Sequence, residues 1–211
     1  MDVLDTKNWV NAKEDNLFQK RYSSYQEYLE HQSSKLGAIG WLKTYHGEFR
    51  EALFKRCEGV VGLRAGATAL CLGARTGAEC EAFTARGALA IGVDLNPGEK
   101  NQLVVHGDFH NLQFADAVFD LVYTNALDHA MDLTKLLAEV RRVLKQGGTF
   151  FAEIVYGSGD ERGREPGAYE SLWWDRVDNV IMQICNGGFW VARRRDLEFP
   201  WQGTAVEFIR A

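Results

Sequence analysis

The feature that most constrains the fold is a short, continuous apolar run followed at once by a glycine-rich turn. Residues 67–72 read ATALCL and residues 73–77 read GARTG. An apolar run without polar alternation is typical of a strand that is buried on both faces. A second such run, ALAIGVD at residues 88–94, follows within about thirty residues, as in a βαβ unit. The sequence therefore predicts two parallel strands joined by a right-handed helical crossover.

A helix is expected between these two strands. One helical face is formed by small or aromatic residues, namely Ala78, Ala82, Phe83 and Ala85. Glu79 and Glu81 lie near the amino end, where the helix dipole favours negative charge, and Gly87 can end the helix.

The alternation of strands and helices continues along the chain. Further strands are expected to end at Asp108 and Thr124. A helix capped by Asp132 follows, with apolar residues at helical spacing: Leu133, Leu136, Leu137, Val140, Val143 and Leu144. The glycine pair at 147–148 is expected to end this helix, and residues 149–156 form the next predicted strand. This pattern predicts a doubly wound, mostly parallel α/β sheet, which is a Rossmann-like fold.

The two ends of the chain flank this core, and we expect a single domain over all 211 residues. Residues 1–59 contain helical patterns at YQEYLE and FREALFKRC, which predict an N-terminal helical extension. These helices either pack on the sheet or form a lid over a ligand, and the lid contacts would then be Trp41, Tyr45 and His46. Residues 60–156 form the predicted ligand-binding core.

Residues 157–211 begin with a breaker-rich loop at 157–167. Residues 171–190 then predict a helix capped by Gly187 and Gly188, and FWVARRRDLEF and TAVEFIR predict two final strands. The tryptophans Trp173 and Trp174 lie either at the mouth of a site or in the core. The arginines at 193–195 fit strand alternation better than a phosphate site.

Composition narrows the class of partner. A net charge of −5 and a pI near 5.6 provide no positive field for phosphates, which disfavours nucleic acid. The cysteines form no C-x-x-C pair, so we expect no metal site and no disulfide framework from Cys57, Cys71, Cys80 and Cys185. No signal peptide is apparent, and no apolar run reaches the ~18 residues of a membrane span. We expect a cytoplasmic protein without a membrane partner.

Open sheets of this kind bind ligands beyond the carboxyl ends of their strands. The candidate segments are residues 73–77, 94–96, 108–110 and 125–129. Asp94 lies 21 residues after Gly73, where a carboxylate can accept hydrogen bonds from two ribose hydroxyls. A nicotinamide dinucleotide site needs G-x-G-x-x-G, but Arg75 occupies the second glycine position, and no G-x-x-x-x-G-K-[ST] loop is present. The pattern favours a nucleoside without a diphosphate.

Four motifs occur together and in order: ALCLGARTG, IGVDLNP, HGDFHNLQFADAVFDLVYTNALDH and LLAEVRRVLKQGGTFFAEI. The segment that carries them, residues 69–154, resembles the core of class I S-adenosylmethionine-dependent methyltransferases. The resemblance implies a seven-stranded sheet whose last two strands are antiparallel. It also implies transfer of a methyl group from S-adenosylmethionine to a small-molecule acceptor, with S-adenosylhomocysteine as the product.

The resemblance assigns roles to the strand-end residues. Gly73 and Gly77 flank the methionine part of the cofactor, with Ala74 and Arg75 between them in the binding turn. Asp94 binds the ribose. The resemblance also implies that Asp108 holds the adenine amino group and that Leu95 and Phe109 flank the adenine ring. Asn125 is the implied neighbour of the sulfonium and of the transferred methyl group.

Two positions depart from the D-x-G-x-G-x-G pattern of the family. Cys71 replaces an acidic residue that helps to hold the cofactor's ammonium group, a loss worth about 1–3 kcal/mol unless another Asp or Glu compensates. Arg75 replaces the middle glycine, and it can clamp the cofactor's carboxylate, point to solvent or crowd the site. These departures keep a second hypothesis open, in which the chain is a non-catalytic relative that acts through a partner. An oxidoreductase is the third hypothesis, and Arg75 disfavours it.

Methyl transfer from a sulfonium mainly needs proximity, alignment and exclusion of water. Where the acceptor must lose a proton, the candidate bases are His129, Asp128 and His110, with His129 as the proposed catalytic residue. The structural alternative is that Asp128 and His129 form a pair at the entry of a helix. The segment TNALDHA lacks the N-x-x-Y/F motif that acts on exocyclic base amines, which disfavours nucleobase methylation.

Overall fold

The computed structural model describes residues 8–11, 16–35, 42–98 and 100–211. Its main sheet has seven strands in the order β5-β4-β3-β6-β7-β10-β9. The strands are β3 (Thr68–Leu72), β4 (Leu89–Asp94), β5 (Val104–His106), β6 (Phe119–Thr124), β7 (Leu144–Val155), β9 (Phe189–Leu197) and β10 (Gly203–Arg210). The first five in this order are parallel, and β10 is antiparallel to both of its neighbours. This arrangement confirms the predicted doubly wound sheet and its antiparallel final pair.

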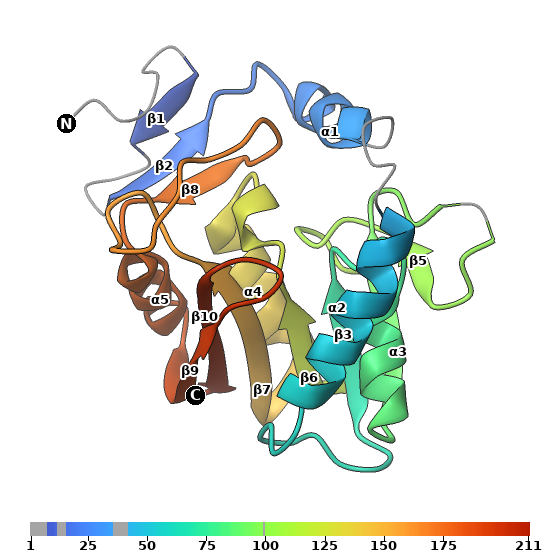
Figure 1. Cartoon of the computed structure of the whole chain (residues 1–211). Coiled ribbons are helices and arrows are strands. Elements are labelled where there is room, and N and C mark those ends of the chain that lie inside the picture. The colour runs from blue at the N-terminus through green and yellow to red at the C-terminus, as the bar shows by residue number, and fades with distance from the viewer. Residues whose placement is uncertain (1–7, 12–15, 36–41, 99) are drawn as a thin grey trace.

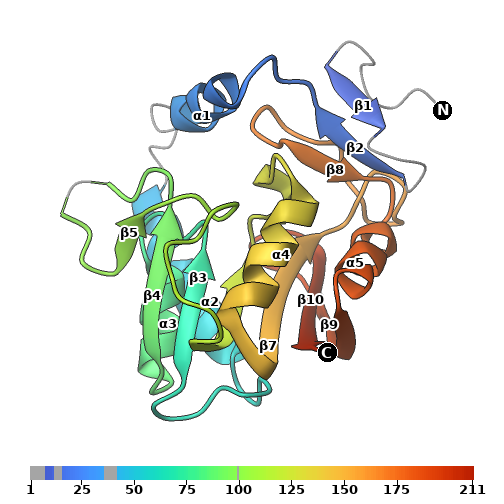
Figure 2. The ribbon, with the colours of Figure 1, turned by 180° about the vertical axis from the view of Figure 1, so that it is seen from behind.

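Helices cover both faces of the sheet (Figures 1 and 2). On one face lie α2 (Leu42–Arg56) and α3 (Ala78–Ala85), and on the other lie α4 (Leu133–Val143) and α5 (Val177–Asn186). Two buried apolar clusters correspond to these two layers: one contains Phe49, Leu53 and Phe83, and the other contains Leu136, Val140 and Ile184. Asp132 caps α4 as predicted, because its side chain accepts the Lys135 backbone N–H at 3.0 Å.

The boundary between α4 and β7 differs from the sequence prediction. The helix ends at Val143, and β7 begins at Leu144, so the glycines at 147–148 lie within the strand. Leu144 is fully buried and pairs with Phe119 of β6. Sheet pairing and burial of this leucine therefore override the helical periodicity that includes it.

A second sheet was not predicted from the sequence. It contains β1 (Trp9–Asn11), β2 (Leu17–Lys20) and β8 (Leu172–Trp174), all antiparallel. The predicted helix from residue 171 is wrong over its first turns, because α5 begins only at Val177. Trp173 and Trp174 are both buried, and the Trp174 indole N–H donates to the Val155 carbonyl at 2.9 Å. Burial of the two indoles against the core stabilises the strand in place of the helix.

The N-terminal helical patterns are confirmed as α1 (Tyr25–Ser34) and α2. Helix α1 lies above the carboxyl ends of the parallel strands, beside the small sheet (Figure 1). Its Tyr25 hydroxyl donates to Asp108 at 2.6 Å, and its Tyr28 hydroxyl donates to the His129 carbonyl at 3.2 Å. The extension is thus tied to the loops that follow β5 and β6.

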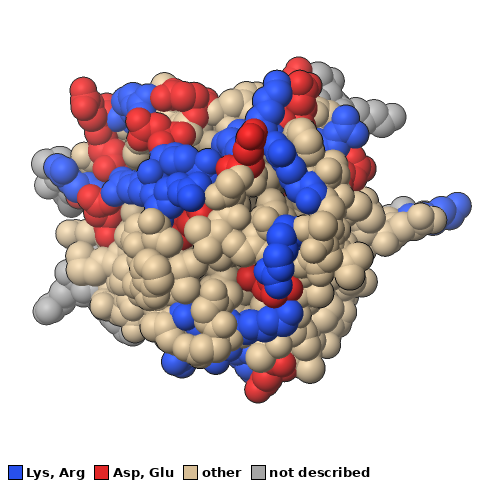
Figure 3. Space-filling model, turned by 90° about the horizontal axis from the view of Figure 1, so that it is seen from below, with Lys and Arg blue, Asp and Glu red and all other residues tan. Residues whose placement is uncertain are grey.

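Charges on the surface are mixed. On the face shown in Figure 3, lysine and arginine side chains lie beside acidic ones. In β9, Arg193 and Arg195 both contact the buried Glu207 carboxylate, and Arg194 contacts Asp178. All three arginines of this triplet are therefore ion-paired, as a structural role predicts. In the described part of the chain, no helix is long and apolar enough to cross a membrane.

Candidate functional site

The turn after β3 brings three strand ends together. Gly73 has a φ of +71°, and a Cβ placed on it would lie 2.7 Å from the Cβ of Ala126 in the loop after β6. Its backbone N–H donates to the Val93 carbonyl of β4 at 2.8 Å. Only glycine combines this backbone conformation with such a close approach. The predicted role of Gly73 in leaving the strand is confirmed.

Asp94 connects the end of β4 to this turn. One of its carboxylate oxygens accepts the Arg75 backbone N–H at 3.0 Å, and the other accepts the Asn96 backbone N–H at 2.7 Å. The carboxylate is largely buried, yet a pair of carboxylate oxygens can accept about four hydrogen bonds. Asp94 therefore orders the turn and retains lone pairs for a further donor.

A cavity of about 220 Å³ lies at these strand ends. Eight of the ten residues predicted from the sequence line it: Gly73, Ala74, Arg75, Asp94, Leu95, Phe109, Asn125 and His129. Other parts of the wall come from helices α1, α2 and α3, from the loop after β7 and from the segment between β9 and β10. The residues that sequence reasoning did not single out include Tyr28, Gln32, Lys35, Phe49, Glu79, Arg164, Glu170 and Trp201.

The other two predicted residues, Gly77 and Asp108, do not line the cavity. Gly77 has a φ of +85° at the start of α3, and an added Cβ would lie 3.2 Å from the Cβ of Leu103. Asp108 accepts hydrogen bonds from the Tyr25 hydroxyl and from the backbone and ring of His110. Although burial opposes ionisation, these hydrogen bonds lower the pKa of Asp108 to about 2. The adenine role of Asp108 stays a prediction.

The three candidate bases have different surroundings. His110 uses both ring nitrogens within the fold, because Nδ1 lies 2.8 Å from Asp108 and Nε2 accepts the backbone N–H groups of Met131 and Asp132 at 3.2 Å. His110 is thus a structural residue. Asp128 and His129 both line the cavity, with 3.9 Å between Asp128 Oδ1 and His129 Nε2.

The tautomer of a neutral His129 ring follows from its contacts. Its Nδ1 lies 3.0 Å from the Tyr169 carbonyl, which can only accept, so Nδ1 carries the proton. Nε2 is then an acceptor, and it lies 3.0 Å from Lys35 Nζ. Burial lowers the pKa of Lys35. Lys35 comes from the end of α1, so no local sequence pattern around His129 could reveal this pair.

The lid contacts proposed from the sequence have mixed outcomes. Tyr45 lines the cavity from α2. His46 instead contacts Thr76 at 3.0 Å and Glu81 at 3.3 Å, outside the cavity. Trp41 lies outside the described residues. From α1, the cavity is bordered by Tyr28, Gln32 and Lys35, so the N-terminal extension forms part of the site wall.

The acidic position of the glycine motif holds a buried thiol. Cys71 is fully buried in β3, and its sulfur is within hydrogen-bonding distance of Cys80 in α3. Burial raises the pKa of the Cys71 thiol, so this side chain is neutral. The adjacent Glu79 is also buried but lines the cavity. Glu79 lies three and four residues before Ala82 and Phe83, which places it on the buried face of α3. This spacing could have identified Glu79 as buried, although a charged residue is usually expected on the exposed face.

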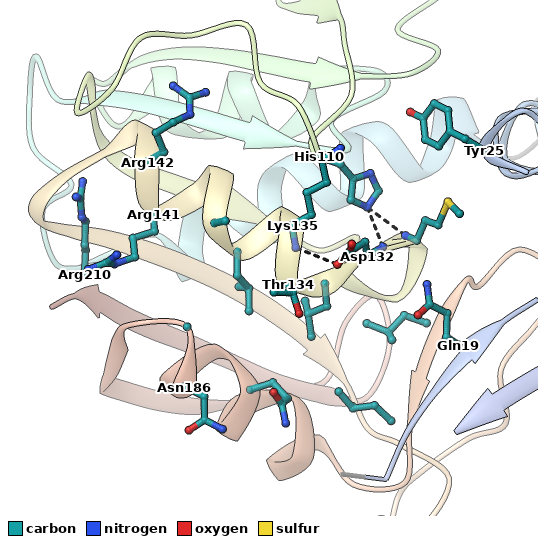
Figure 4. A pocket seen from close by; sticks show the side chains of 18 residues that line it. Gln19, Tyr25, His110, Asp132, Thr134, Lys135, Arg141, Arg142, Asn186 and Arg210 are labelled. Atoms are coloured by element: carbon teal, nitrogen blue, oxygen red, sulfur yellow. Dashed lines mark hydrogen bonds between the residues drawn. The ribbon is translucent and has the colours of Figure 1, made fainter. Parts of the chain in front are cut away.

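A larger groove of about 1200 Å³ runs along α4, and residues of α5 and of the small sheet line it as well (Figure 4). At one end, His110 Nε2 accepts the backbone N–H groups that precede the helix, and at the other end lie Arg141, Arg142 and Arg210. None of the cofactor-binding residues predicted from the sequence lines this groove. The strand ends open into the smaller cavity, which is therefore the candidate site.

Comparison with known families agrees with the position of this cavity. Residues 70–152 match the family model described as "Methyltransferase domain". These residues begin in β3 and end within β7, and so include the ends of β3, β4, β5 and β6. Residues 70–152 thus match a methyltransferase domain, and the sheet has the fold of class I methyltransferases.

Curated methyltransferases are similar to this chain over part of its length. A sterol 24-C-methyltransferase of Gibberella zeae is 30% identical over 186 residues, which cover 75% of this chain and 44% of that protein. A dimethylglycine N-methyltransferase of Parasynechococcus marenigrum is 40% identical over 74 residues, 34% of this chain and 26% of that protein. The chain thus spans less than half the length of each of these two relatives.

Solved structures share the fold of this methyltransferase domain. A chain from the complex of the Haloferax volcanii Trm112 methyltransferase activator with a methyltransferase has a TM-score of 0.63 and 19% identity, with 88% of this chain and 97% of that chain covered. The [4+2]-cyclase SpnF also has a TM-score of 0.63, at 14% identity, with 75% of this chain and 80% of that chain covered. At this level of identity the likeness concerns the fold alone.

Proposed function

We propose that this chain transfers the methyl group of S-adenosylmethionine to a small-molecule acceptor. The observation that supports this most strongly is the convergence of Gly73, Asp94, Phe109 and Asn125 on one cavity at the carboxyl ends of the parallel strands. A nucleoside fits this set, because Asp94 has lone pairs for ribose hydroxyls and Phe109 offers an apolar ring face.

The residues of the cavity also fit the amino-acid part of the cofactor. Glu79 Oε2 is buried and has no hydrogen-bond partner among the described residues, so a cationic group in the cavity would satisfy it. Bound S-adenosylmethionine supplies a methyl group on a sulfonium, which is a good leaving group. The chain's own task is to bind and orient the two reactants and to exclude water, and the N-terminal extension shields the cavity for this purpose.

His129 is the proposed proton acceptor where the acceptor molecule must lose a proton. Its Nε2 is the unprotonated nitrogen in the neutral ring, and it faces Lys35 across 3.0 Å. The Tyr169 carbonyl fixes the orientation of the ring. An acceptor that displaces Lys35 from Nε2 would place its proton on that nitrogen.

The walls of the cavity favour a polar acceptor. Charged side chains reach it from α1, from the loop after β6 and from the loop after β7, namely Lys35, Asp128, Arg164 and Glu170. Arg164 contacts the Glu170 carboxylate at 3.0 Å, so this pair can hold an acceptor with charged groups of either sign. An entirely apolar acceptor would leave these charges desolvated, at a cost of several kcal/mol.

Calorimetric titration with S-adenosylmethionine, S-adenosylhomocysteine and NAD tests the cofactor. We expect micromolar binding of the first two and no binding of NAD. Formation of S-adenosylhomocysteine in the presence of small polar acceptors then tests methyl transfer. The rate with a His129→Gln variant measures how much His129 contributes as the proton acceptor. Preference for NAD, or no binding of any of the three, would contradict the proposal.

The second candidate is a non-catalytic relative that acts through a partner. It is favoured by the neutral thiol of Cys71 at the acidic position and by Arg75 in the turn. This candidate predicts weak binding of S-adenosylhomocysteine and no methyl transfer to any acceptor. The same titration and transfer assay separate the two candidates.

A further inference from the structure

Glu79 lines the cavity, and the fold uses its carboxyl group only in part, through a hydrogen bond with its own backbone. Glu79 is 6% exposed, and in the described parts of the chain its Oε2 has no hydrogen-bond partner. The neighbouring Glu81 is different, because it contacts His46 at 3.3 Å and Arg50 at 3.4 Å near the surface. A buried carboxylate oxygen without a partner costs free energy, and a ligand with a cationic group would remove that cost.

The position of Glu79 relates it to the missing acid of the glycine motif. Glu79 precedes Cys80 in α3, and Cys80 contacts the thiol of Cys71 in β3. Glu79 is close enough to Cys71 to contribute to the raised pKa of its thiol. Helix α3 therefore brings the Glu79 carboxyl group near Cys71, which occupies the acidic position of the glycine motif.

We propose that Glu79 binds the ammonium group of the methionine part of S-adenosylmethionine and thereby replaces the acid that is absent at Cys71. The inference rests on the proposed function. Glu79 lies in the first turn of α3, and it lines the cavity together with residues 73–76 of the preceding turn. The positive charge of Arg75 in that turn acts to lower the pKa of Glu79, but Arg75 does not hydrogen-bond to Oε2.

The protonation of Glu79 gives this role a measurable consequence. Burial, together with the charges of Asp94 and Glu153, raises the pKa of Glu79 to about 8. The titratable and charged groups that face it from neighbouring elements are Tyr45, Cys71, Arg75, Asp94, Tyr123 and Glu153. In the free protein near pH 6.5 this carboxyl is neutral, whereas an α-ammonium with a pKa of about 8 is still charged. Binding should then release a proton from Glu79.

The first experiment is calorimetric titration of the wild type and Glu79→Gln with three probes. S-adenosylhomocysteine has the ammonium but no sulfonium, S-adenosylmethionine has both, and methylthioadenosine has neither. We expect Glu79→Gln to weaken both amino-acid-containing ligands about ten- to a hundredfold and methylthioadenosine less than about twofold. Glu81→Gln is the matched control from the same helix and should leave all three affinities unchanged.

The second experiment measures proton release when S-adenosylhomocysteine binds at pH 6.5, in two buffers of different ionisation enthalpy. The wild type should release close to one proton, and Glu79→Gln should release none. This readout on the wild type also applies if the variant fails to fold.

The outcomes separate the inference from the proposed function. If the wild type binds neither S-adenosylhomocysteine nor methylthioadenosine, the proposed function is wrong and the inference with it. If the wild type binds both and Glu79→Gln has the same affinities and proton release, only the inference is overturned. A loss for S-adenosylmethionine alone would assign Glu79 to the sulfonium and would also overturn it.

Discussion

The backbone N–H of Arg75 donates to the Asp94 carboxylate across 3.0 Å and so joins the turn after β3 to the end of β4. The second carboxylate oxygen accepts from Asn96, which orders the loop after β4 as well. Asp94 is therefore both a structural acceptor and a wall of the cavity. A ligand that donates to Asp94 meets a carboxylate whose orientation is already determined by two backbone groups, which lowers the entropic cost of binding.

Replacement of Asp94 by alanine should weaken S-adenosylhomocysteine binding by about 1–3 kcal/mol, because an ionised acceptor for the ligand is lost. It should also lower stability, since two backbone N–H groups lose their acceptor. Asp94→Asn is the matched control, because its amide oxygen can still accept one of these bonds. Calorimetry and urea unfolding measure the two effects. Unchanged affinity in Asp94→Ala would show that the ribose site lies elsewhere.

Arg75 has a φ of +27°, in the region that side chains with a Cβ rarely adopt. Such residues carry strain of about 1–3 kcal/mol, and glycine removes it at a cost of about 0.5–1 kcal/mol in unfolded-state entropy. Arg75→Gly should therefore raise the free energy of unfolding by about 1 kcal/mol. Arg75→Ala retains the Cβ and should bring no gain. Equal stabilities of the two variants in urea would argue against strain at this position.

The pH dependence of stability should report on Asp108. Hydrogen bonds from His110 and Tyr25, acting against burial, lower its pKa to about 2 from an ordinary value near 4. A carboxyl with a lowered pKa in the folded state stabilises the protein above its unfolded pKa, and this contribution is lost as the pH falls from about 4 to about 2. Asp108→Asn should reduce the fall in the free energy of unfolding over that pH interval. Asp196→Asn, at an exposed position, is the control and should leave this fall unchanged. Identical acid profiles of the wild type and Asp108→Asn would contradict this assignment.

Short apolar runs in the sequence correctly predicted the central parallel strands of the sheet. The apolar runs before Gly73 and before Asp94 became β3 and β4, and because parallel strands end at one edge of the sheet, their last residues meet there. The end of α4 was not predictable, because Leu144 satisfies the helical period but is buried in the sheet. Strand β8 pairs with β2 from more than a hundred residues earlier, and no local signal encodes such pairing.

Some residues of the candidate site could be predicted from the sequence and others could not. Residues at or just after the strand ends, such as Asp94 and Asn125, could be found from motif spacing. Lys35 could not, because only the packing of α1 over the strand ends brings it to His129. Glu79 had a usable signal in its spacing to Ala82 and Phe83, but a glutamate in the first turn of a helix is also explained by the helix dipole.

The buried ion pair between Arg56 and Glu153 supports the last prediction. Arg56 Nε lies 2.6 Å from Glu153 Oε1 and Nη2 lies 3.0 Å from Oε2, which is a bidentate contact between α2 and β7. Glu153 is only 1% exposed, so removal of its partner leaves a buried carboxylate without a counter-ion.

Arg56→Met should therefore lower the free energy of unfolding by about 3–5 kcal/mol. The exposed pair of Arg50 with Glu81 is the matched control, and Arg50→Met should cost less than about 1 kcal/mol. Urea unfolding of both variants measures the difference. Tyr45 and Phe49 of α2 line the cavity, so Arg56→Met should also weaken S-adenosylhomocysteine binding. A loss of stability without any loss of affinity would show that α2 does not shape the site.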